Sequence, residues 1–191
     1  MTSIDIYKKY ESLFHDLKLI IKLSERRVIG ENTDTLYSHN VNFFVKSYLI
    51  NICSYLEALL QDLATMRAIE INSRLIQASI PHNYLLWRLT DNIKDKELAY
   101  KVSDLHISKK EISDNLSANP YKTIKLFQKL GVDLGSNQDF LKNKDLVSTI
   151  VNKRNSIIHH NDRAADISFS DLTIYIDTIT SYSKGIAKSL L

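Results

Sequence analysis

Apolar side chains recur every three or four residues along most of this chain, a spacing that places them on one face of an α-helix. The pattern predicts a first helix over about residues 3–26, followed by a break at Gly30 and Asn32. A second helical stretch without proline or glycine covers about residues 36–75, as one rod or as two pieces. The two apolar stripes consist of Tyr7, Tyr10, Phe14, Leu17, Ile20 and Ile21, and of Leu49, Ile52, Cys53, Leu56, Leu59, Leu60 and Leu63.

Shorter helical patterns follow in the second half of the chain. Pro81 suits the first turn of a short helix, since the N–H that proline lacks is not needed there. Asn119 and Pro120 predict the start of a helix that Gly131 ends. Further helices are expected from about residue 143 to 159 and from Ser168 or Ser170 to the end, where Ser168 and Asp171 have capping-box spacing. The polar residues 91–118 fit either short helices or a mobile excursion from the bundle.

Composition supports an all-α fold. The chain has 191 residues but only 4 glycines and 2 prolines, about 3% of the total against roughly 12% in average usage, so tight turns are few. This length can bury one substantial core without a second domain, and we see no internal repeat or linker. We therefore predict a single all-α domain over residues 1–191.

Several function classes lack the residues that they need. Cys53 is the sole cysteine, which excludes an internal disulfide and a multi-cysteine metal site. The scattered glycines form no phosphate-binding loop, and HExxH and GxSxG are both absent. We therefore expect no metal and no cofactor. Neither a secretory signal nor a stretch near the ~18 apolar residues of a membrane span is visible, so we expect a soluble cytoplasmic protein without a membrane partner.

Charge adds a weak indication of a nucleic-acid partner. The net charge of +3 is too small to identify one by itself. Residues 142–163, however, hold five cations and only two anions. A cluster of this size is most often a solvated face.

Within this segment, Arg154 lies on the apolar face of the predicted helix with Val147, Ile150, Val151, Ile157 and Ile158. A guanidinium keeps its proton, so burying it without an anion costs several kcal/mol, roughly the penalty of an unpaired buried ion. Arg154 therefore needs either a carboxylate from elsewhere in the fold or a ligand that is itself an anion, such as a phosphodiester. Glu57, at the edge of the second stripe, is the candidate carboxylate, although an ordinary exposed glutamate is the commoner case.

Two histidines follow Arg154. His159 lies five residues later, about 140° around an ideal helix, so the two side chains do not converge from the middle of one helix. The helix must end there, as Asn161 would allow, or the site must be shared with another chain. His159 and His160 are adjacent and point in different directions, so we expect only one of them to act.

The neighbouring polar side chains have plain explanations as well as functional ones. Histidines at helix ends are usually caps or surface residues, and Lys153 is typical of a solvated lysine. Asn155 shares a helix face with His159 and could simply donate a hydrogen bond to it.

The segment LVSTIVNKRNSIIHHND, residues 146–162, resembles the signature of HEPN domains, in which an arginine, usually followed by a polar residue, is separated from a histidine by four to six intervening residues. Arg154, Asn155 and His159 match with four intervening residues, and His160 matches with five. The stretches NPYKTIKLFQKLGVDL and SYLEALLQDL also resemble the helices that flank this signature in RiboL-PSP-type and related prokaryotic HEPN proteins.

The resemblance implies a HEPN-like bundle of four to five main helices with short accessory helices, which forms a homodimer with Arg154 and His159 of both chains in one cleft. It implies a metal-independent endoribonuclease that serves as a toxin or an anti-phage defence effector, with RNA as substrate and an antitoxin or defence-system protein as a further partner. His159 would be the general acid or base and Arg154 the phosphate ligand, with Asn155, His160, Lys153 and Glu57 in supporting roles.

The chain departs from the family pattern at two positions. Some HEPN toxins carry a modifiable tyrosine two residues after the histidine, where this chain has Asn161. The residue after the histidine is often small, whereas here it is His160, so the acting histidine stays ambiguous. Two alternatives remain open: a non-catalytic HEPN module that binds a nucleotide, RNA or protein, and a structural helical dimer in which Arg154 pairs with Glu57.

Overall fold

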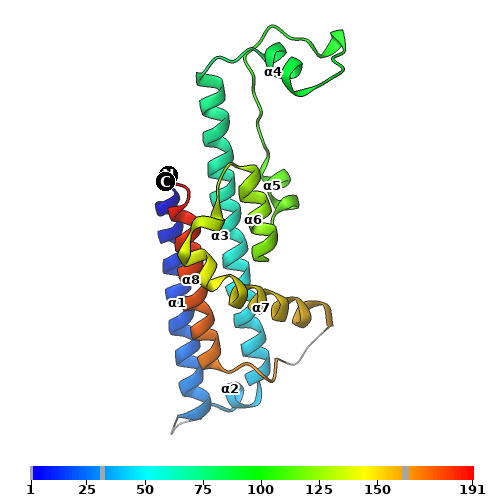
Figure 1. Cartoon of the computed structure of the whole chain (residues 1–191). Helices are drawn as coiled ribbons and strands as arrows, with labels where there is room; N and C mark the ends of the chain where they lie inside the picture. Colours follow the sequence, from blue (N-terminus) through cyan, green and yellow to red (C-terminus); the bar gives the residue numbers. More distant parts are fainter. Residues whose placement is uncertain (1, 31–32, 161–163) are drawn as a thin grey trace.

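The structure is a computed structural model that describes residues 2–30, 33–160 and 164–191, and it is helical through most of them (Figure 1). In this part of the chain the one pairing of extended backbone is an isolated bridge between Pro81 and Val102, so the all-α prediction is confirmed. The helices are α1 (Ser3–Ile29), α2 (Thr35–His39), α3 (Val41–Gln77), α4 (His82–Leu89), α5 (Lys109–Asn115), α6 (Pro120–Lys129), α7 (Gln138–His160) and α8 (Phe169–Lys188), with 3₁₀ turns η1 (Asp95–Glu97) and η2 (Leu134–Ser136).

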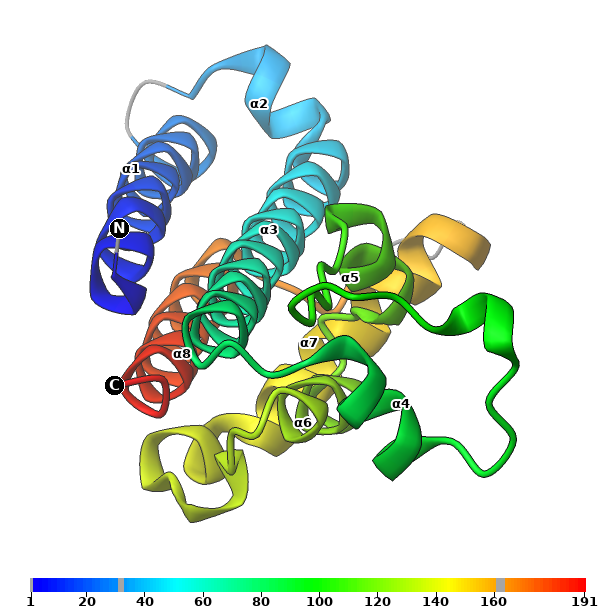
Figure 2. The same ribbon diagram turned by 90° about the horizontal axis from the view of Figure 1, so that it is seen from above.

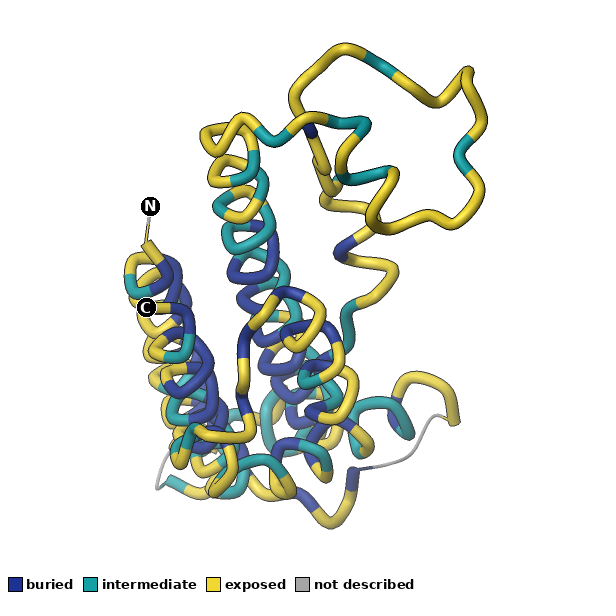
Figure 3. Tube along the Cα trace, turned by 45° about the horizontal axis from the view of Figure 1, so that its top comes forward, coloured by how far each residue is buried: buried dark blue, intermediate teal, exposed yellow. Residues whose placement is uncertain are grey.

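Four long helices form the bundle. Helix α8 packs against α1, α3 and α7, and α3 packs against α1 and α7 (Figure 2). Most core residues lie on these helices, and Figure 3 colours the buried residues along the trace dark blue. Burying each large apolar side chain contributes about 1.5–3 kcal/mol, so these residues hold the bundle together. The most buried include Phe14, Leu49, Leu56, Leu60, Phe140, Ile179 and Tyr182.

The N-terminal half follows the predicted pattern with two differences. Helix α1 extends to Ile29, three residues beyond the predicted end, and the predicted break at Asn32 lies outside the described residues. The predicted second stretch consists of two pieces, α2 and α3, which meet at Asn40. The Asn40 amide donates to the Leu36 carbonyl at 2.8 Å and so caps the end of α2.

Between α3 and α5 the chain leaves the bundle as an arm, which we define as residues 78–108 (Figure 1). Within the described residues, the hydrophobic core contains no side chain between Ala64 and Ile112. Pro81 precedes the first helical residue of α4, instead of lying in its first turn. The polar residues 91–118 contain the short helices η1 and α5, which agrees with one of the two predictions for this stretch. The chain between these helices is extended and lies away from the bundle, which agrees with the other.

Side-chain caps set the ends of the C-terminal helices. Asn119 caps α6, and Gly131 adopts φ 71° just after it, both as predicted. Helix α7 begins at Gln138, five residues before the predicted start, because Asn137 Oδ1 accepts from Phe140 N at 3.0 Å. Ser168 and Asp171 form the predicted capping box of α8, which ends at Lys188, before the chain does.

Helix α3 meets the length and hydropathy of a membrane span, with a mean hydropathy of 1.3 over 18 residues. This differs from the expectation that no stretch would do so. The core helix of a globular bundle passes the same test, and α3 lies against α1, α7 and α8.

Candidate functional site

Arg154 lies on the side of α7 that faces α3, between the buried Val151 and Ile157. Its side chain is 14% exposed, and its Nη2 donates to Oε1 of Glu57 on α3. Its Nη1 donates to Asn155 Oδ1 at 3.2 Å. The carboxylate therefore compensates the charge that the apolar face of α7 would otherwise leave unpaired. Of the two explanations that the sequence left open for Arg154, the structure shows the carboxylate partner, and Glu57 is the candidate that supplies it.

The guanidinium keeps donors for a ligand. An arginine has five N–H donors, of which Glu57 and Asn155 take one each. The Nε–H of Arg154 is buried and has no hydrogen-bond partner in the described part of the chain. An unpaired buried donor of this kind costs about 1–3 kcal/mol. The other N–H groups that these two partners leave unused, one on each Nη nitrogen, belong to a side chain that is 14% exposed.

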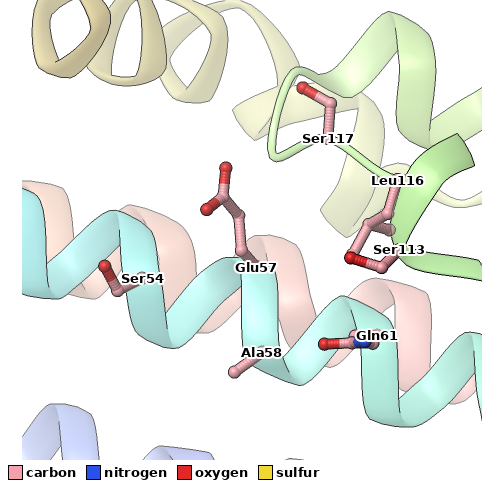
Figure 4. A pocket seen from close by; sticks show the side chains of 7 residues that line it. All are labelled: Ser54, Glu57, Ala58, Gln61, Ser113, Leu116 and Ser117. Carbon is pink, nitrogen blue, oxygen red and sulfur yellow. The ribbon is translucent and has the colours of Figure 1, made fainter. Parts of the chain in front are cut away.

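Glu57 lies at a pocket between α3 and α5. The pocket has a volume of about 350 Å³, and its side chains carry hydroxyl, amide and carboxylate groups. Glu57 is 40% exposed and points away from α3 into this space, as Figure 4 shows. The lining residues are Ser54, Glu57, Ala58, Gln61, Ser113, Leu116 and Ser117.

Cys53 lies one turn before Glu57 on α3 and is completely buried. Burial raises the pKa of its thiol to about 12, although the nearby charge of Arg154 acts in the opposite direction. The thiol is therefore neutral at physiological pH. It packs as a small apolar group and cannot serve as a nucleophile.

Both histidines lie on the last turn of α7, which continues to His160, and both are exposed. The predicted helix stop at Asn161 is outside the described residues. On a regular helix His159 and His160 are rotated by about 140° and 120° from Arg154, in opposite directions. Neither imidazole forms a hydrogen bond with another described residue. A single copy of α7 therefore does not direct either histidine at its own Arg154.

The two remaining predicted site residues have partners. Asn155 accepts from Arg154, so it positions the guanidinium and does not hydrogen-bond to His159. Lys153 Nζ lies 2.7 Å from Asp166 Oδ1. The structure thus brings Arg154, Asn155 and Glu57 together and leaves the two histidines and Lys153 apart from them. Asp162 and Arg163, which belong to the predicted basic segment, lie outside the described residues.

The sequence interpretation did not identify the pocket around Glu57. Ser54 and Gln61 lie three residues before and four after Glu57, a spacing that places all three on one helix face and could have been noticed. Ser113 and Ser117 fall in the polar stretch 91–118, where periodicity gave no signal. In the parts of the chain that the structure describes, no group of three or more His, Cys, Asp and Glu side chains could hold a metal ion.

Comparison with known proteins identifies the family. No curated protein and no solved structure matches the chain. The model of the RiboL-PSP-HEPN family matches residues 7–191, which include α3 with Glu57, the pocket and the whole of α7. This match covers nearly the entire chain, so the protein belongs to the RiboL-PSP-HEPN family.

Proposed function

We propose that this protein is a metal-independent endoribonuclease of HEPN type, acting in the cytoplasm as a toxin or anti-phage defence effector. The observation that supports this most is the state of Arg154. Its guanidinium is fixed by Glu57 and Asn155 and retains unused N–H donors, and its partner Glu57 lines a polar pocket. A preorganised arginine of this kind suits a phosphodiester, which it can bind through two parallel hydrogen bonds.

RNA supplies its own nucleophile, the 2′-OH, so the protein needs only to move protons and to stabilise charge. In this mechanism one histidine, His159 or its neighbour His160, takes the 2′-OH proton, a contribution of roughly 10²–10⁴ in rate. The O2′–P bond forms, the P–O5′ bond breaks, and the leaving 5′ oxygen takes up a proton from solvent, to which the imidazolium returns the proton that it received. Arg154 stabilises the phosphorane charge. The products carry a 2′,3′-cyclic phosphate and a 5′-OH, and DNA is not cleaved.

A second copy of the chain completes the site in this proposal. Because α7 directs His159 away from its own Arg154, a two-fold dimer is the arrangement that places the histidine of one copy beside the arginine of the other. Ile158, next to His159, is 48% exposed and supplies apolar surface for such an interface. Lys153 would add non-specific attraction to the RNA backbone. An antitoxin or a defence-system protein would control the activity.

Two other functions are compatible with single features of the site. A non-catalytic HEPN module that binds a nucleotide, RNA or protein is favoured because Glu57 and Asn155, and no histidine among the described residues, hydrogen-bond to Arg154. A purely structural role is favoured by the ion pair itself, since Glu57 already compensates the charge of Arg154. In the structural case, Glu57→Ala and Arg154→Ala would lower the melting temperature equally, and neither would change any RNA-dependent property.

The nuclease proposal is tested by incubating total RNA, in the presence of a chelator, with the wild type and three variants, Arg154→Ala, His159→Ala and His160→Ala. Wild type is expected to leave 2′,3′-cyclic phosphate ends. Arg154→Ala and one histidine variant are expected to lose at least about a hundredfold in rate. His15→Ala and Arg74→Ala, which change exposed residues far from the site along the chain, are the matched controls and should cleave like wild type.

Cleavage that persists in both histidine variants would contradict the mechanism. RNA binding without cleavage, lost in Arg154→Ala, would support the non-catalytic module. Circular dichroism of each variant shows whether a lost activity reflects lost folding.

A further inference from the structure

The pocket beside Glu57 has the size and the chemistry of a site for one nucleobase. Its volume of about 350 Å³ is near the lower end for small-molecule sites, roughly 300–1,000 Å³. Ala58 and Leu116 give it apolar surface against which a flat ring can lie, and the hydroxyls and the amide give it polar groups at the edges. Because Glu57 also binds Arg154, a base in the pocket would lie next to a phosphate on Arg154.

One carboxylate oxygen of Glu57 is available to a ligand. Arg154 donates to Oε1, and among the described residues none donates to Oε2. Each carboxylate oxygen can accept more than one hydrogen bond, and an ionised carboxylate cannot donate. The group on this wall of the pocket is therefore an acceptor that requires N–H donors from its ligand.

Ser117 supplies the opposite kind of group on the facing wall (Figure 4). Its Oγ accepts from Asn119 N at 3.2 Å, so its own proton remains to be donated to a ligand. The pocket thus offers acceptors at Glu57 and a donor at Ser117. A complementary base edge carries two adjacent N–H groups beside a carbonyl oxygen.

We propose that this pocket binds a guanine base of the RNA whose phosphate lies on Arg154. The inference rests on the proposed function, in which Arg154 contacts an RNA phosphate. Guanine presents N1–H and the N2 amino group to Glu57, while the lone pair of O6 that points away from this edge accepts from Ser117. Cytosine and adenine place an acceptor nitrogen beside their amino group, and uracil places a carbonyl on each side of N3–H. A carboxylate facing those bases meets a repelling acceptor, which discriminates against them.

The test measures binding of nucleoside 3′-monophosphates by calorimetry, which does not require cleavage. Guanosine 3′-monophosphate is expected to bind wild type at least about tenfold more tightly than the uridine compound, since charge-assisted hydrogen bonds discriminate by this amount or more. The inosine compound, which keeps N1–H and lacks the N2 amino group, is expected to bind with intermediate affinity.

Two variants separate the base from the phosphate. Glu57→Gln replaces one acceptor by a donor and should reduce the guanosine preference to less than about threefold, while uridine binding through Arg154 changes little. Ala58→Phe fills the pocket, leaves the Arg154–Glu57 pair in place, and should abolish the preference. Glu70→Gln is the matched control, because Glu70 lies on the same helix, is 34% exposed and pairs with Arg67 and Arg74.

Equal affinity for all the nucleotides, or a preference that survives Ala58→Phe, would overturn the inference. A loss of the same size for every nucleotide in Glu57→Gln would also overturn it, because Glu57 would then act only through Arg154. RNA cleavage without base preference contradicts the guanine site and leaves the nuclease proposal standing. A guanosine preference without RNA cleavage contradicts the nuclease and supports the pocket.

Discussion

At the scale of single residues, the ion pair of Arg154 and Glu57 shows what a sequence can and cannot predict. An arginine on an apolar helix face needs an anion to compensate its charge. Glu57 was the candidate because it borders the apolar stripe of the longest predicted helix. The direction of the Asn155 side chain was not predictable. Helical spacing pairs it with His159, whereas in the structure it accepts from its neighbour Arg154. The direction of the Asn155 side chain depends on where Glu57 holds the guanidinium, and that position is set by the packing of α3 against α7.

Cys53 provides a prediction about pH. In the unfolded chain its thiol ionises near its ordinary pKa of 9.0, whereas burial raises the pKa to about 12 in the folded protein. Above pH 9 the unfolded state therefore releases a proton that the folded state retains, so stability is intact below pH 9 and decreases above it. The loss approaches about 1.4 kcal/mol per pH unit between these two pKa values.

Urea unfolding of wild type and Cys53→Ala at pH 8, 9, 10 and 10.5 measures this effect. The difference in free energy of unfolding between the two proteins should be constant up to pH 9 and should then shift in favour of the variant. Parallel pH profiles would show that the thiol is not buried as described.

At the scale of helices, the contact between α7 and α8 explains why α7 starts early. Asn137 caps α7 through Phe140 N, and its amide donates to the Gly185 carbonyl of α8 at 3.1 Å. The cap is thus fixed by a helix that lies 48 residues further along the chain. Sequence patterns report local signals, so they predicted the Ser168 cap of α8, whose partner Asp171 is local, and placed the start of α7 five residues too late.

Gly185→Ala tests this contact. An added Cβ would lie 2.6 Å from Asn137 Oδ1 and 2.8 Å from Phe140 N, distances that require the helices to move apart. At an exposed helical site the same change would stabilise by about 0.5–1 kcal/mol. Here we expect a loss of about 1–3 kcal/mol from overpacking, measured by thermal and urea unfolding. Lys184→Ala, at the exposed neighbouring position, should change stability by less than about 0.5 kcal/mol. A Gly185→Ala protein as stable as wild type would contradict this packing.

At the scale of the whole molecule, the sequence predicted the all-α class and the family, and for the arm it left short helices and an excursion from the bundle as alternatives. The bundle helices carry long apolar stripes, and burial of those stripes determines how they pack. Residues 78–108 carry exposed apolar side chains without a stripe, such as Trp87 at 64% and Leu89 at 76% exposure. Their path depends on a few polar contacts, including Leu105 N to Asn72 Oδ1 at 2.8 Å. Periodicity does not encode contacts of this kind.

The arm should be removable. Its outgoing and returning segments come together where His82 N donates to the Lys101 carbonyl at 3.0 Å and Ser103 N donates to the Ile80 carbonyl at 2.9 Å. A four-residue Gly–Ser linker in place of residues 82–101 therefore closes a gap that is already short. Since this segment contributes no core side chain, the free energy of unfolding should change by less than about 1 kcal/mol in urea unfolding. Loss of cooperative unfolding would show that the arm stabilises the bundle.

The proposed dimer predicts that two inactive variants recover activity when they are mixed, which a monomeric enzyme would not do. If the histidine of one copy acts with the arginine of the other, a heterodimer of Arg154→Ala and His159→Ala chains retains one complete pair. Mixing the two inactive variants, with exchange of subunits, should therefore restore RNA cleavage to roughly a quarter of the wild-type rate. Half of the dimers are then mixed, and each mixed dimer holds one of the two Arg154–His159 pairs. Should His160 be the acting histidine, His160→Ala takes the place of His159→Ala.

The matched control separates action between chains from action within one chain. A heterodimer of wild type and the Arg154→Ala, His159→Ala double variant contains one Arg154 side chain and one His159 side chain, but both lie on the same copy. Between-chain action predicts that these heterodimers are inactive, so excess double variant should inhibit wild type. Within-chain action predicts the reverse in both mixtures, with no rescue in the first and half activity in the second. Differently tagged chains confirm that exchange has occurred. The rotation of about 140° between Arg154 and His159 on α7 favours the between-chain outcome.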